Sequence, residues 1–493
     1  MKRRTLMKSS AALFGITALG GYTFLRNAGL CYASPAEGFT NALPIPPILE
    51  SDVSPDGTKF FAFNADTGEK SFIPGFTTAT LGYSGSYLGP TIKVRDGEQV
   101  KFKIDNKLDQ VTTVHWHGLH VPAQWDGGPR QVIEAGGTWN PAFRVNQPAA
   151  TLWYHPHAMG LTGEHVYRGL AGLFIIEDDN SDKLEIPKEY GVDDFPLVLQ
   201  DRRFFEDGSF AYVQNMMDVM HGVVGNYMLV NGSLWPNLDV PKGMVRLRLL
   251  NGSNSSIYRI SFNDDRSFFQ VATDGGFQER PVTLKSLVLS AGERSEILVD
   301  FTNDKMGSKI SLFVDQMVGN RFEAMQFTVN KTPANTYSIP DKLVSIDWLT
   351  ESQAVKTRKF QMETMSGGMG MMRGGGRLTI NGRNMDLNFI NERVKLGDTE
   401  IWEIENYSAM MMQLPHSMHL HDVQFQILDR NGKKPSPAEQ GRKDTVLVQP
   451  GERVRIISRF EDYEGIYMYH CHFLEHEDNG MMGQFEVYLD NRA

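Results

Sequence analysis

The sequence predicts an all-β chain of three successive domains, each of them a Greek-key β-sandwich. Short alternating segments, such as residues 91–95 and 100–104, are separated by Gly, Pro, Asn and Asp, and this pattern is typical of strands joined by turns. Few segments keep a helical periodicity over any length. Two sequence elements also recur three times, about 150 residues apart, and this indicates one kind of domain built three times over.

The first repeated element runs from a Gly- or Pro-containing turn through a strand to an Asn, and the second is a glycine turn. The first covers residues 89–106, 231–251 and 381–406, and the second covers residues 135–137, 291–294 and 450–453. These repeats place the domains at residues 34–178, 195–330 and 353–493, with linkers at 177–194 and 331–352.

Residues 1–33 have the form of a secretory leader, with a basic start and an apolar run from Ala11 to Leu25. The pair Arg3-Arg4 indicates the twin-arginine export machinery, which would deliver the protein to the periplasm. We expect cleavage after Ala33, which would leave no membrane span. An uncleaved anchor is the alternative, and it is disfavoured because the apolar run is shorter than the roughly 20 residues that cross a bilayer.

Charge and cysteine content narrow the possible partners. The formal net charge is −10, and removal of the leader, which carries five basic residues and no acid, leaves −15. Nucleic acid is therefore not an expected partner, because phosphate binding depends on basic clusters. The two cysteines are Cys31, in the leader, and Cys471. The exported protein would keep one unpaired thiol in an oxidising compartment, and metal ligation gives a physical reason to retain it.

Ten of the thirteen histidines lie in four short motifs. The motifs are His115-Trp116-His117, His155-Pro156-His157, His416-Ser417-Met418-His419-Leu420-His421, and His470-Cys471-His472 with His476. On a strand, a His-x-His motif points both imidazoles to one face, and neutral imidazole is a good copper ligand. Two motifs fall in the first predicted domain and two in the third. The sequence therefore predicts a copper cluster between these domains, with the middle domain as a spacer.

The segment around Cys471 carries ligands for a second kind of copper site. A blue, electron-transferring copper takes two His, one Cys and a weak axial Met. Cys471, His476 and Met481 supply three of these ligands, and the second His would come from elsewhere. If the segment is extended, Cys471 points to one face and its two neighbouring histidines to the other, so adjacent residues would join the two sites. Structural zinc is the competing interpretation, but such sites are closed tetrahedra rich in Cys.

These motifs, their order and the threefold layout resemble the multicopper oxidase family over essentially the whole mature chain, and most of all its bacterial periplasmic copper-tolerance oxidases. The resemblance implies three cupredoxin-like domains that bind four copper ions and reduce O2 to water with electrons from one-electron donors. It implies a type 1 copper on Cys471, His416, His476 and Met481, and a type 2 copper on His115 and His419. It implies a type 3 copper pair on His117, His155, His157, His421, His470 and His472. Ser417 and Asp422 replace the usual Pro and Gly of the family, and neither change removes a ligand.

Two acids occupy positions that match family carboxylates near the cluster. Glu477 follows the ligand His476, and Asp126 lies in Trp125-Asp126-Gly127-Gly128. A carboxylate there would relay protons or orient water, and the alternative is an ordinary turn or surface acid. The other three histidines, His120, His165 and His221, match no family ligand, and we expect them to be structural or surface residues.

Methionines give an indication of the electron donor. The glycine-rich segment 362–372 carries Met362, Met365, Met369, Met371 and Met372. We expect it to be a mobile loop, because its glycines disfavour both strand and helix. Thioethers prefer Cu(I), and the copper-tolerance members of the family carry a similar Met-rich insertion in the third domain, so Cu(I) is the expected substrate. Further methionines precede His416, at 410–412, and His221, at 216, 217 and 220.

Three other functions fit parts of the same pattern. A laccase-like enzyme would oxidise small phenolic or metal reductants at an open type 1 edge, with the Met segment as incidental cover. A copper-storage or carrier protein would use the same ligands without catalysis. A relative that has lost its copper and serves in cell division is disfavoured, because all ten His ligands, Cys471 and Met481 are present. We expect the mature protein to be a monomer.

Overall fold

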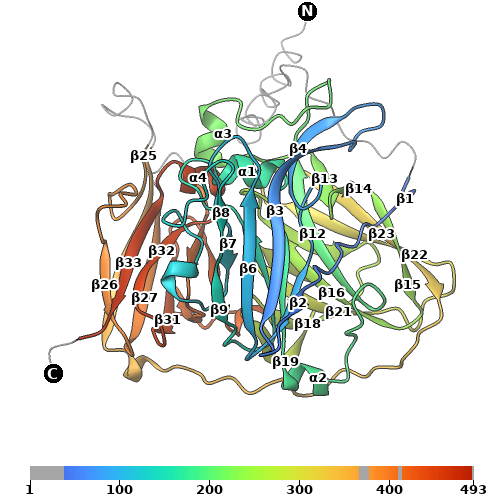
Figure 1. Cartoon of the computed structure of the whole chain (residues 1–493). Helices are drawn as coiled ribbons and strands as arrows, with labels where there is room; N and C mark the ends of the chain where they lie inside the picture. Colours follow the sequence, from blue (N-terminus) through green and yellow to red (C-terminus); the bar gives the residue numbers. More distant parts are fainter. Residues whose placement is uncertain (1–37, 366–376, 409–412, 491–493) are drawn as a thin grey trace, which may run out of the picture.

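The structure is a computed structural model that describes residues 38–365, 377–408 and 413–490. The predicted leader therefore lies outside the described residues. Within those ranges the chain forms three two-sheet β-sandwiches with a few short helices, and the predicted all-β fold of cupredoxin-like domains is confirmed. In Figure 1 the first sandwich (blue to teal) stands in the middle, with the second (green to yellow) on its right and the third (orange to red) on its left.

The first sandwich packs a sheet of order β5-β11-β10-β7 against a sheet of order β2-β3-β6-β8, to which β4 and β9 add through β3 and β6. Strand β6 shows why the sequence folds this way: Val100, Phe102 and Ile104 are buried, while Lys101 and Lys103 between them are exposed. The strands are β2 (Asp52–Val53), β3 (Lys59–Lys70), β4 (Thr78–Tyr83), β5 (Ile92–Arg95), β6 (Gln99–Asn106), β7 (His115–His117), β8 (Thr138–Trp139), β9 (Ala142–Arg144), β10 (Ala150–His155) and β11 (Gly172–Glu177).

The second sandwich has sheets of order β1-β15-β23-β22-β17-β20 and β14-β13-β12-β16-β21-β18-β19 around an aliphatic and aromatic core. Its strands are β1 (Asn41–Ala42), β12 (Asp194–Arg202), β13 (Tyr227–Val230), β14 (Ser233–Leu234), β15 (Pro236–Pro241), β16 (Met244–Asn251), β17 (Tyr258–Phe262), β18 (Phe268–Thr273), β19 (Gly276–Leu284), β20 (Ser286–Leu289), β21 (Arg294–Asp300), β22 (Lys309–Gln316) and β23 (Arg321–Lys331).

The third sandwich has sheets of order β25-β24-β27-β31-β29 and β26-β33-β32-β28-β30. Its strands are β24 (Lys356–Met365), β25 (Arg377–Ile380), β26 (Glu392–Lys395), β27 (Thr399–Ser408), β28 (His416–Leu420), β29 (Gln426–Arg430), β30 (Thr445–Val448), β31 (Arg453–Arg459), β32 (Gly465–Cys471) and β33 (Met482–Tyr488). Its core also takes in Met220, Ile257 and Ala291 of the second sandwich, so these two sandwiches share an apolar contact.

Two details depart from the expectations. Strand β1 lies in the range predicted for the first domain, yet it pairs with β15 of the second sandwich. The expected loop at 362–372 does not begin at Met362, because β24 continues to Met365 and Met362 is fully buried in the core of the third sandwich. That part of the loop prediction is wrong. Met369, Met371 and Met372 lie outside the described residues.

Short helices and one long connection complete the fold. Helices α1 (Thr162–Arg168), α3 (Met216–His221) and α4 (Leu474–Asp478) gather on the upper face in Figure 1, and α4 contacts both of the others. The remaining helical segments are α2 (Asp179–Lys183) and the 3-10 turns η2 (Ala123–Trp125), η3 (Glu351–Gln353) and η5 (Pro437–Glu439). None of the helices in the described ranges is long and apolar enough to cross a membrane.

The connection between the second and third sandwiches, residues 332–355, follows the lower edge of the molecule in Figure 1. The connection is hydrogen-bonded to both of the sandwiches that it joins. The Leu343 N–H donates to the carbonyl oxygen of Glu279 at 2.8 Å, and the Leu349 N–H donates to Oε1 of Gln426 at 2.8 Å. The long span brings the last sandwich back beside the first, and the histidine motifs meet there.

Candidate metal centres

Two strand pairs from different sandwiches present the histidine motifs to each other. In the first sandwich β7 runs antiparallel to β10, with His115 opposite His155. In the third, β28 runs antiparallel to β32, with His419 opposite His470. Because side chains alternate along a strand, the two histidines of each motif share a face. Eight imidazoles thereby meet in a buried space between the first and third sandwiches.

Rings from the two sandwiches pair across this space. His117 stacks on His419 with ring centroids 3.7 Å apart, and His115 stacks on His421 at 3.9 Å. All eight imidazoles are at most 1 % exposed. Burial, with help from neighbouring imidazoles, lowers the pKa of each of these four histidines well below its usual 6.5. The rings therefore stay neutral at ordinary pH, which is the form that binds a metal.

Three nitrogens converge at one end of the cluster. The Nε2 atoms of His157 and His470 lie 3.1 Å apart, and Nε2 of His421 lies 3.2 Å from each of them. Three neutral imidazole nitrogens at such distances cannot all satisfy one another by hydrogen bonds. A metal ion bound to all three would satisfy them.

His115 and His419 each leave one ring nitrogen without a partner. The Nδ1–H of His115 donates to the carbonyl oxygen of Asp126 at 2.9 Å, and the Nδ1–H of His419 donates to that of Asp444 at 2.8 Å. These bonds direct the lone pair to Nε2. Both Nε2 atoms are buried and have no hydrogen-bond partner in the part of the chain that the structure describes. An unpaired buried nitrogen is costly, so both rings suit a metal ion.

The remaining three cluster histidines form a second group. His117 Nδ1 lies 3.4 Å from His155 Nε2, and the His472 ring lies 4.8 Å from the His117 ring and 5.4 Å from the His155 ring, between centroids. Neither nitrogen of His472 has a hydrogen-bond partner within the described ranges. The eight imidazoles thus divide into a group of three, another group of three and a pair.

Both predicted carboxylates touch cluster imidazoles on the side away from their converging Nε2 atoms. Glu477 places Oε1 3.2 Å from His157 Nδ1 and Oε2 3.1 Å from His470 Nδ1. Asp126 Oδ2 accepts from His421 Nδ1 at 2.8 Å. Burial alone would raise the pKa of Glu477, but the two histidines hold it below its usual value, whereas burial and nearby Asp422 raise the pKa of Asp126 well above its usual value.

A third carboxylate, Asp444, was missed from the sequence. Its Oδ1 accepts from His117 Nε2 at 3.0 Å, so it orients that ring as the other two acids orient theirs. Arg294 of the second sandwich binds both oxygens of Asp444, at 2.7 and 2.6 Å. The middle sandwich is therefore more than a spacer, because it holds a residue that orients a cluster imidazole.

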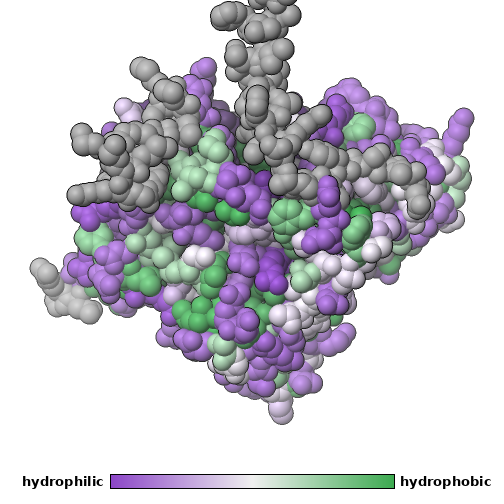
Figure 2. Space-filling model, turned by 90° about the horizontal axis from the view of Figure 1, so that it is seen from above, coloured by the Kyte–Doolittle hydropathy of each residue, from purple (hydrophilic) through white to green (hydrophobic). Residues whose placement is uncertain are grey.

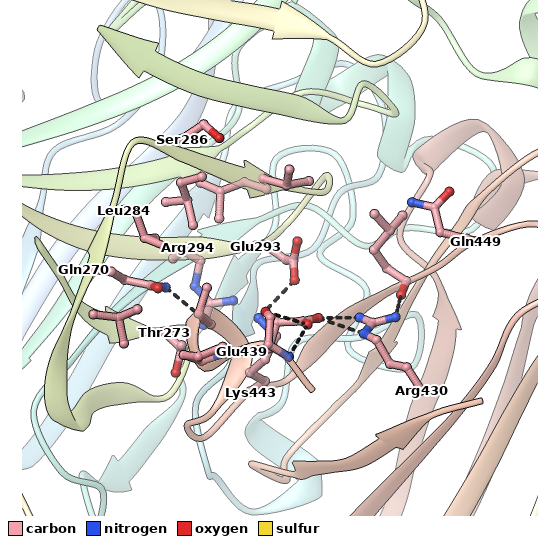
Figure 3. A pocket seen from close by; sticks show the side chains of 18 of the residues that line it. Gln270, Thr273, Leu284, Ser286, Glu293, Arg294, Arg430, Glu439, Lys443 and Gln449 are labelled. Carbon is pink, nitrogen blue, oxygen red and sulfur yellow. Dashed lines mark hydrogen bonds and ion pairs between the residues drawn. The ribbon is translucent and has the colours of Figure 1, made fainter. Parts of the chain in front are cut away.

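Arg294 and the neighbouring Lys443 belong to a buried ionic network between the second and third sandwiches (Figure 3). Lys443 Nζ binds Asp274 at 2.7 Å and Glu293 at 2.9 Å, and all these side chains are less than 10 % exposed. Glu293, Arg294 and Lys443 line a cavity of about 550 Å³, and the apolar residues Leu284 and Leu287 line it too. Arg294, as part of this network, holds Asp444 in place from the second sandwich.

A separate site forms around Cys471, on the opposite face of β32. Its Sγ lies 3.5 Å from Nδ1 of His416 and 3.5 Å from Nδ1 of His476. Met481 is fully buried, and its backbone bonds both Cys471 and His476. Burial raises the pKa of the Cys471 thiol to about 12, a cost that a bound cation offsets by holding the thiolate. One thiolate, two imidazoles and a thioether are the donor set of a blue copper, and the residues present fit that ion.

The outer edges of both imidazoles at this site are closed. The Nε2–H of His476 donates to the carbonyl oxygen of Met220 in α3, at 3.0 Å, and Nε2 of His416 lies 3.2 Å from Oγ1 of Thr364. Both rings are no more than 1 % exposed. A reductant at the surface therefore touches neither ring directly.

The three histidines outside the motifs have different surroundings. His165 is buried against Gln110 and Thr112 and is structural. His120 lies between Asp422 and Asp462 of the third sandwich. His221 ends α3, and its Nε2 is shielded from solvent without a hydrogen-bond partner among the described residues.

Comparison with known proteins agrees with this geometry. Residues 65–181 and residues 353–491 each match a domain family described as multicopper oxidase. The chain is 37 % identical to the multicopper oxidase mco of Staphylococcus aureus over 447 residues, covering 91 % of this chain and 92 % of that one. It is 34 % identical to the cell division protein FtsP of Escherichia coli over 472 residues, covering 92 % and 94 %.

Among solved structures, the chain is similar to a laccase-like multicopper oxidase, CueO, from the lignin-degrading bacterium Ochrobactrum sp.. The TM-score is 0.83 at 38 % identity, and the match covers 90 % of this chain and 100 % of that one. A match over nine-tenths of this chain extends over all three sandwiches.

Proposed function

Because the chain belongs to the multicopper oxidase family, we propose that this oxidoreductase oxidises Cu(I) and reduces O2 to water, in the service of copper tolerance. Four Cu(I) ions each lose one electron, and one O2 takes up four electrons and four protons to give two water molecules. The observation that carries the choice of Cu(I) is the closure of His476 and His416 by Met220 and Thr364.

We propose four resident copper ions. Type 1 would be held by Cys471, His416, His476 and Met481, type 2 by His115 and His419, and the type 3 pair by His117, His155, His472, His157, His421 and His470. The free Nε2 atoms of His115 and His419 and the convergence of His157, His421 and His470 support this division. Bound copper supplies one-electron chemistry between Cu(I) and Cu(II).

The backbone provides the electron route. Cys471 is joined by single peptide links to His470 and His472, whose rings lie in the cluster on the other face of the strand. An electron received at the Cys471 sulfur therefore reaches a cluster imidazole through covalent bonds alone. The His472 N–H also donates to the carbonyl oxygen of Ser417, which fixes the end of β32 against β28.

We propose that Glu477 and Asp126 handle protons for O2 reduction. Glu477 bridges the Nδ1 atoms of two cluster histidines, and Asp126 receives the Nδ1–H of a third. Both carboxylates therefore lie one imidazole ring away from the position where oxygen would be reduced, in a space closed to bulk water. A carboxylate so placed can hold a proton or orient a water molecule.

A laccase-like activity is the second candidate. The Ochrobactrum protein is described as having oxidase activity towards lignin model compounds and lignosulfonate. A bulky phenol, however, needs an open approach to a type 1 imidazole, and α3 covers His476 here. We therefore expect phenols to be poor substrates.

We propose a periplasmic location, reached by the twin-arginine machinery, and a monomeric enzyme. The basic and apolar pattern of residues 1–33 supports the export route. The similarity to the cell division protein would favour a partner protein without copper. The proposed copper ligands of this chain, however, converge in two compact sites. That convergence favours an enzyme over a copper-free partner protein.

The test measures Cu(I) and a small phenol, 2,6-dimethoxyphenol, side by side with the copper-loaded enzyme. We expect kcat/KM for Cu(I) to exceed that for the phenol by at least about tenfold, the factor that a contact of 1.4 kcal/mol in the transition state gives. Replacement of Met369, Met371 and Met372 by Leu should lower Cu(I) oxidation and leave phenol oxidation unchanged or faster. A phenol preference in the parent enzyme would replace the cuprous-oxidase function with the laccase function.

A further inference from the structure

Helix α3 of the second sandwich is fixed firmly over the Cys471 site. At its start, the Asn215 side chain caps the helix by accepting from the Met217 N–H at 2.8 Å. Asp218 then forms two hydrogen bonds with the Arg203 guanidinium, at 2.9 and 2.8 Å. Both residues are at most 9 % exposed, so this is a buried, bidentate ion pair that holds the helix against its own sandwich.

The end of α3 is fastened to the third sandwich. The Val223 N–H donates to Oε2 of Glu475 in α4 at 3.2 Å, and the Met220 side chain is buried in the core of the third sandwich. The Met220 carbonyl oxygen accepts the Nε2–H of His476 at 3.0 Å. The helix backbone thus lies one hydrogen bond away from an imidazole of the Cys471 site.

One face of α3 carries a thioether and an imidazole. Met217 and His221 are four residues apart, so their side chains are neighbours on one face of the helix. Met217 is 47 % exposed. The Nε2 atom of His221 is shielded from solvent yet makes no hydrogen bond with any described residue. Seen from above, the upper side of the molecule shows apolar patches (green) among polar side chains (Figure 2).

A thioether beside an unpartnered imidazole has the donor set that Cu(I) prefers, since Cu(I) is soft and tolerates few ligands. We propose that Met217 and His221 form a docking site for substrate Cu(I) on the outer face of α3. Exposed Met216 lies beside them and guides the ion to the site. Burial lowers the pKa of His221, so its lone pair is available at neutral pH.

This inference rests on the proposed Cu(I) function and adds the place where the electron enters. Cu(I) held at Met217 and His221 loses one electron, which passes through the Met220 carbonyl and its hydrogen bond to His476. O2 remains the final acceptor. The resulting Cu(II) binds a thioether weakly, so it loses one of its two protein ligands and is held less tightly than Cu(I). The helix that excludes a bulky phenol thereby provides the path for a metal ion.

The first experiment uses Ag(I), a redox-inert ion with the ligand preference of Cu(I), in calorimetric titrations of the copper-loaded enzyme. Met217→Leu and His221→Gln should each remove one Ag(I) equivalent or weaken its binding at least tenfold. Met306→Leu is the matched control, because Met306 of the same sandwich is 55 % exposed, against 47 % for Met217, and lies in the turn before β22. The opposite end of β22 contacts the segment after α3. It should leave the titration unchanged.

The second experiment measures steady-state rates with the same variants after checking their copper content, blue absorbance and melting temperature. Met217→Leu and His221→Gln should raise KM for Cu(I) about tenfold, so the ratio of Cu(I) to phenol activity falls by that factor. Unchanged Ag(I) binding and unchanged KM in both variants would overturn the docking site while leaving the Cu(I) function standing. A parent enzyme that binds Ag(I) through these residues but does not oxidise Cu(I) would keep the site and reject the proposed function.

Discussion

Arg294 holds Asp444 by two hydrogen bonds of 2.7 and 2.6 Å across the boundary between the second and third sandwiches. Both side chains are at most 1 % exposed. Asp444 in turn receives the Nε2–H of His117. A residue of the second sandwich, which contributes no imidazole to the cluster, therefore fixes the orientation of a cluster imidazole, and this relationship can be tested apart from overall stability.

We predict that Arg294→Lys weakens copper binding in the cluster, because lysine keeps the charge but cannot bind both oxygens of Asp444. Asp444 would then no longer be held in place to orient His117, and the affinity of the cluster for copper should fall about 10–100-fold. Copper analysis should show fewer bound copper ions per chain, lost from the proposed type 3 pair that His117 would help to hold, while the blue absorbance of the Cys471 site remains.

Arg248→Lys provides the matched control for that prediction. Arg248 is also buried and binds Asp194 through several hydrogen bonds of 2.6 to 3.0 Å, but it contacts no proposed copper ligand. Both variants should lose roughly 1–3 kcal/mol of stability, and only Arg294→Lys should lose cluster copper. Equal copper contents in the two variants would show that Arg294 is merely structural.

The Cys471→Ser variant should lose its blue colour and its oxidase activity while keeping the fold. The serine hydroxyl fills nearly the same volume in a buried site, but it is a hard, weak donor that does not replace a thiolate. His470 and His472 remain, so we expect cluster copper to stay above half of the parent content. The blue absorbance, oxidase assays, copper analysis and circular dichroism check these outcomes, and a variant that stays blue would reject the type 1 assignment.

Removal of copper should loosen the contact between the first and third sandwiches. The cluster takes four histidines from each, and a ligand that binds only the folded form stabilises it by about 4 kcal/mol at a thousand times its dissociation constant. Calorimetry should therefore show a lower melting temperature for the copper-free protein, and proteolysis should cut the 332–355 connection faster. Identical melting of the two forms, with copper contents verified, would contradict a cluster that bridges sandwiches.

His120 should make this same boundary sensitive to alkaline pH. Its Nδ1 lies 2.8 Å from Asp422 and its Nε2 lies 3.1 Å from Asp462, while the Tyr463 ring lies 4.7 Å from the imidazole. Burial alone would lower the pKa of His120, but the two acids outweigh it and raise the pKa to about 9. The charged imidazole therefore bridges two sandwiches.

A pKa above the unfolded value of about 6.5 means that the stabilisation is fully present below pH 6.5 and disappears as the pH rises to about 9. Asp462 is half exposed, so solvent weakens its interaction with His120. We therefore expect the free energy of unfolding to fall by on the order of 2 kcal/mol over this pH window. His120→Gln should remove the pH dependence and be less stable than the parent at pH 6.5. Denaturant unfolding at pH 6.5 and 9.5 measures this, and parallel pH profiles would exclude His120 as the cause.

The histidine motifs could be recognised in the sequence because each lies within a few residues and follows the two-residue period of a strand. Asp444 and Arg294 could not be recognised in this way. The contact of Asp444 depends on the register of β30 beside β28, and that of Arg294 depends on the packing of two sandwiches. Arg294 lies in one of the repeated glycine turns, so the sequence marked its segment as architectural without indicating its partner.

The extent of the methionine loop was misjudged for a local reason. Met362 pairs with Ile380 in β25 and with Asn406 in β27, and its apolar side chain faces the core. The glycines that disfavour a strand begin only at Gly367. The average composition of residues 362–372 therefore did not indicate that a buried strand ends inside this segment.

The role of α3 as a cover over the Cys471 site could not be predicted from the sequence either, because it depends on the hydrogen bond between Met220 and His476.

The cluster brings together residues that are far apart in the chain: His157 and His470, whose Nε2 atoms are 3.1 Å apart, are separated by 313 positions. Half of the cluster ligands are translated before the second sandwich, and the other half come from the third sandwich, which is translated after it. A nascent chain or a truncated product thus has no complete cluster. Copper capture by the proposed cluster would consequently follow the synthesis of both sandwiches, whereas the ligands of the Cys471 site all come from the third sandwich.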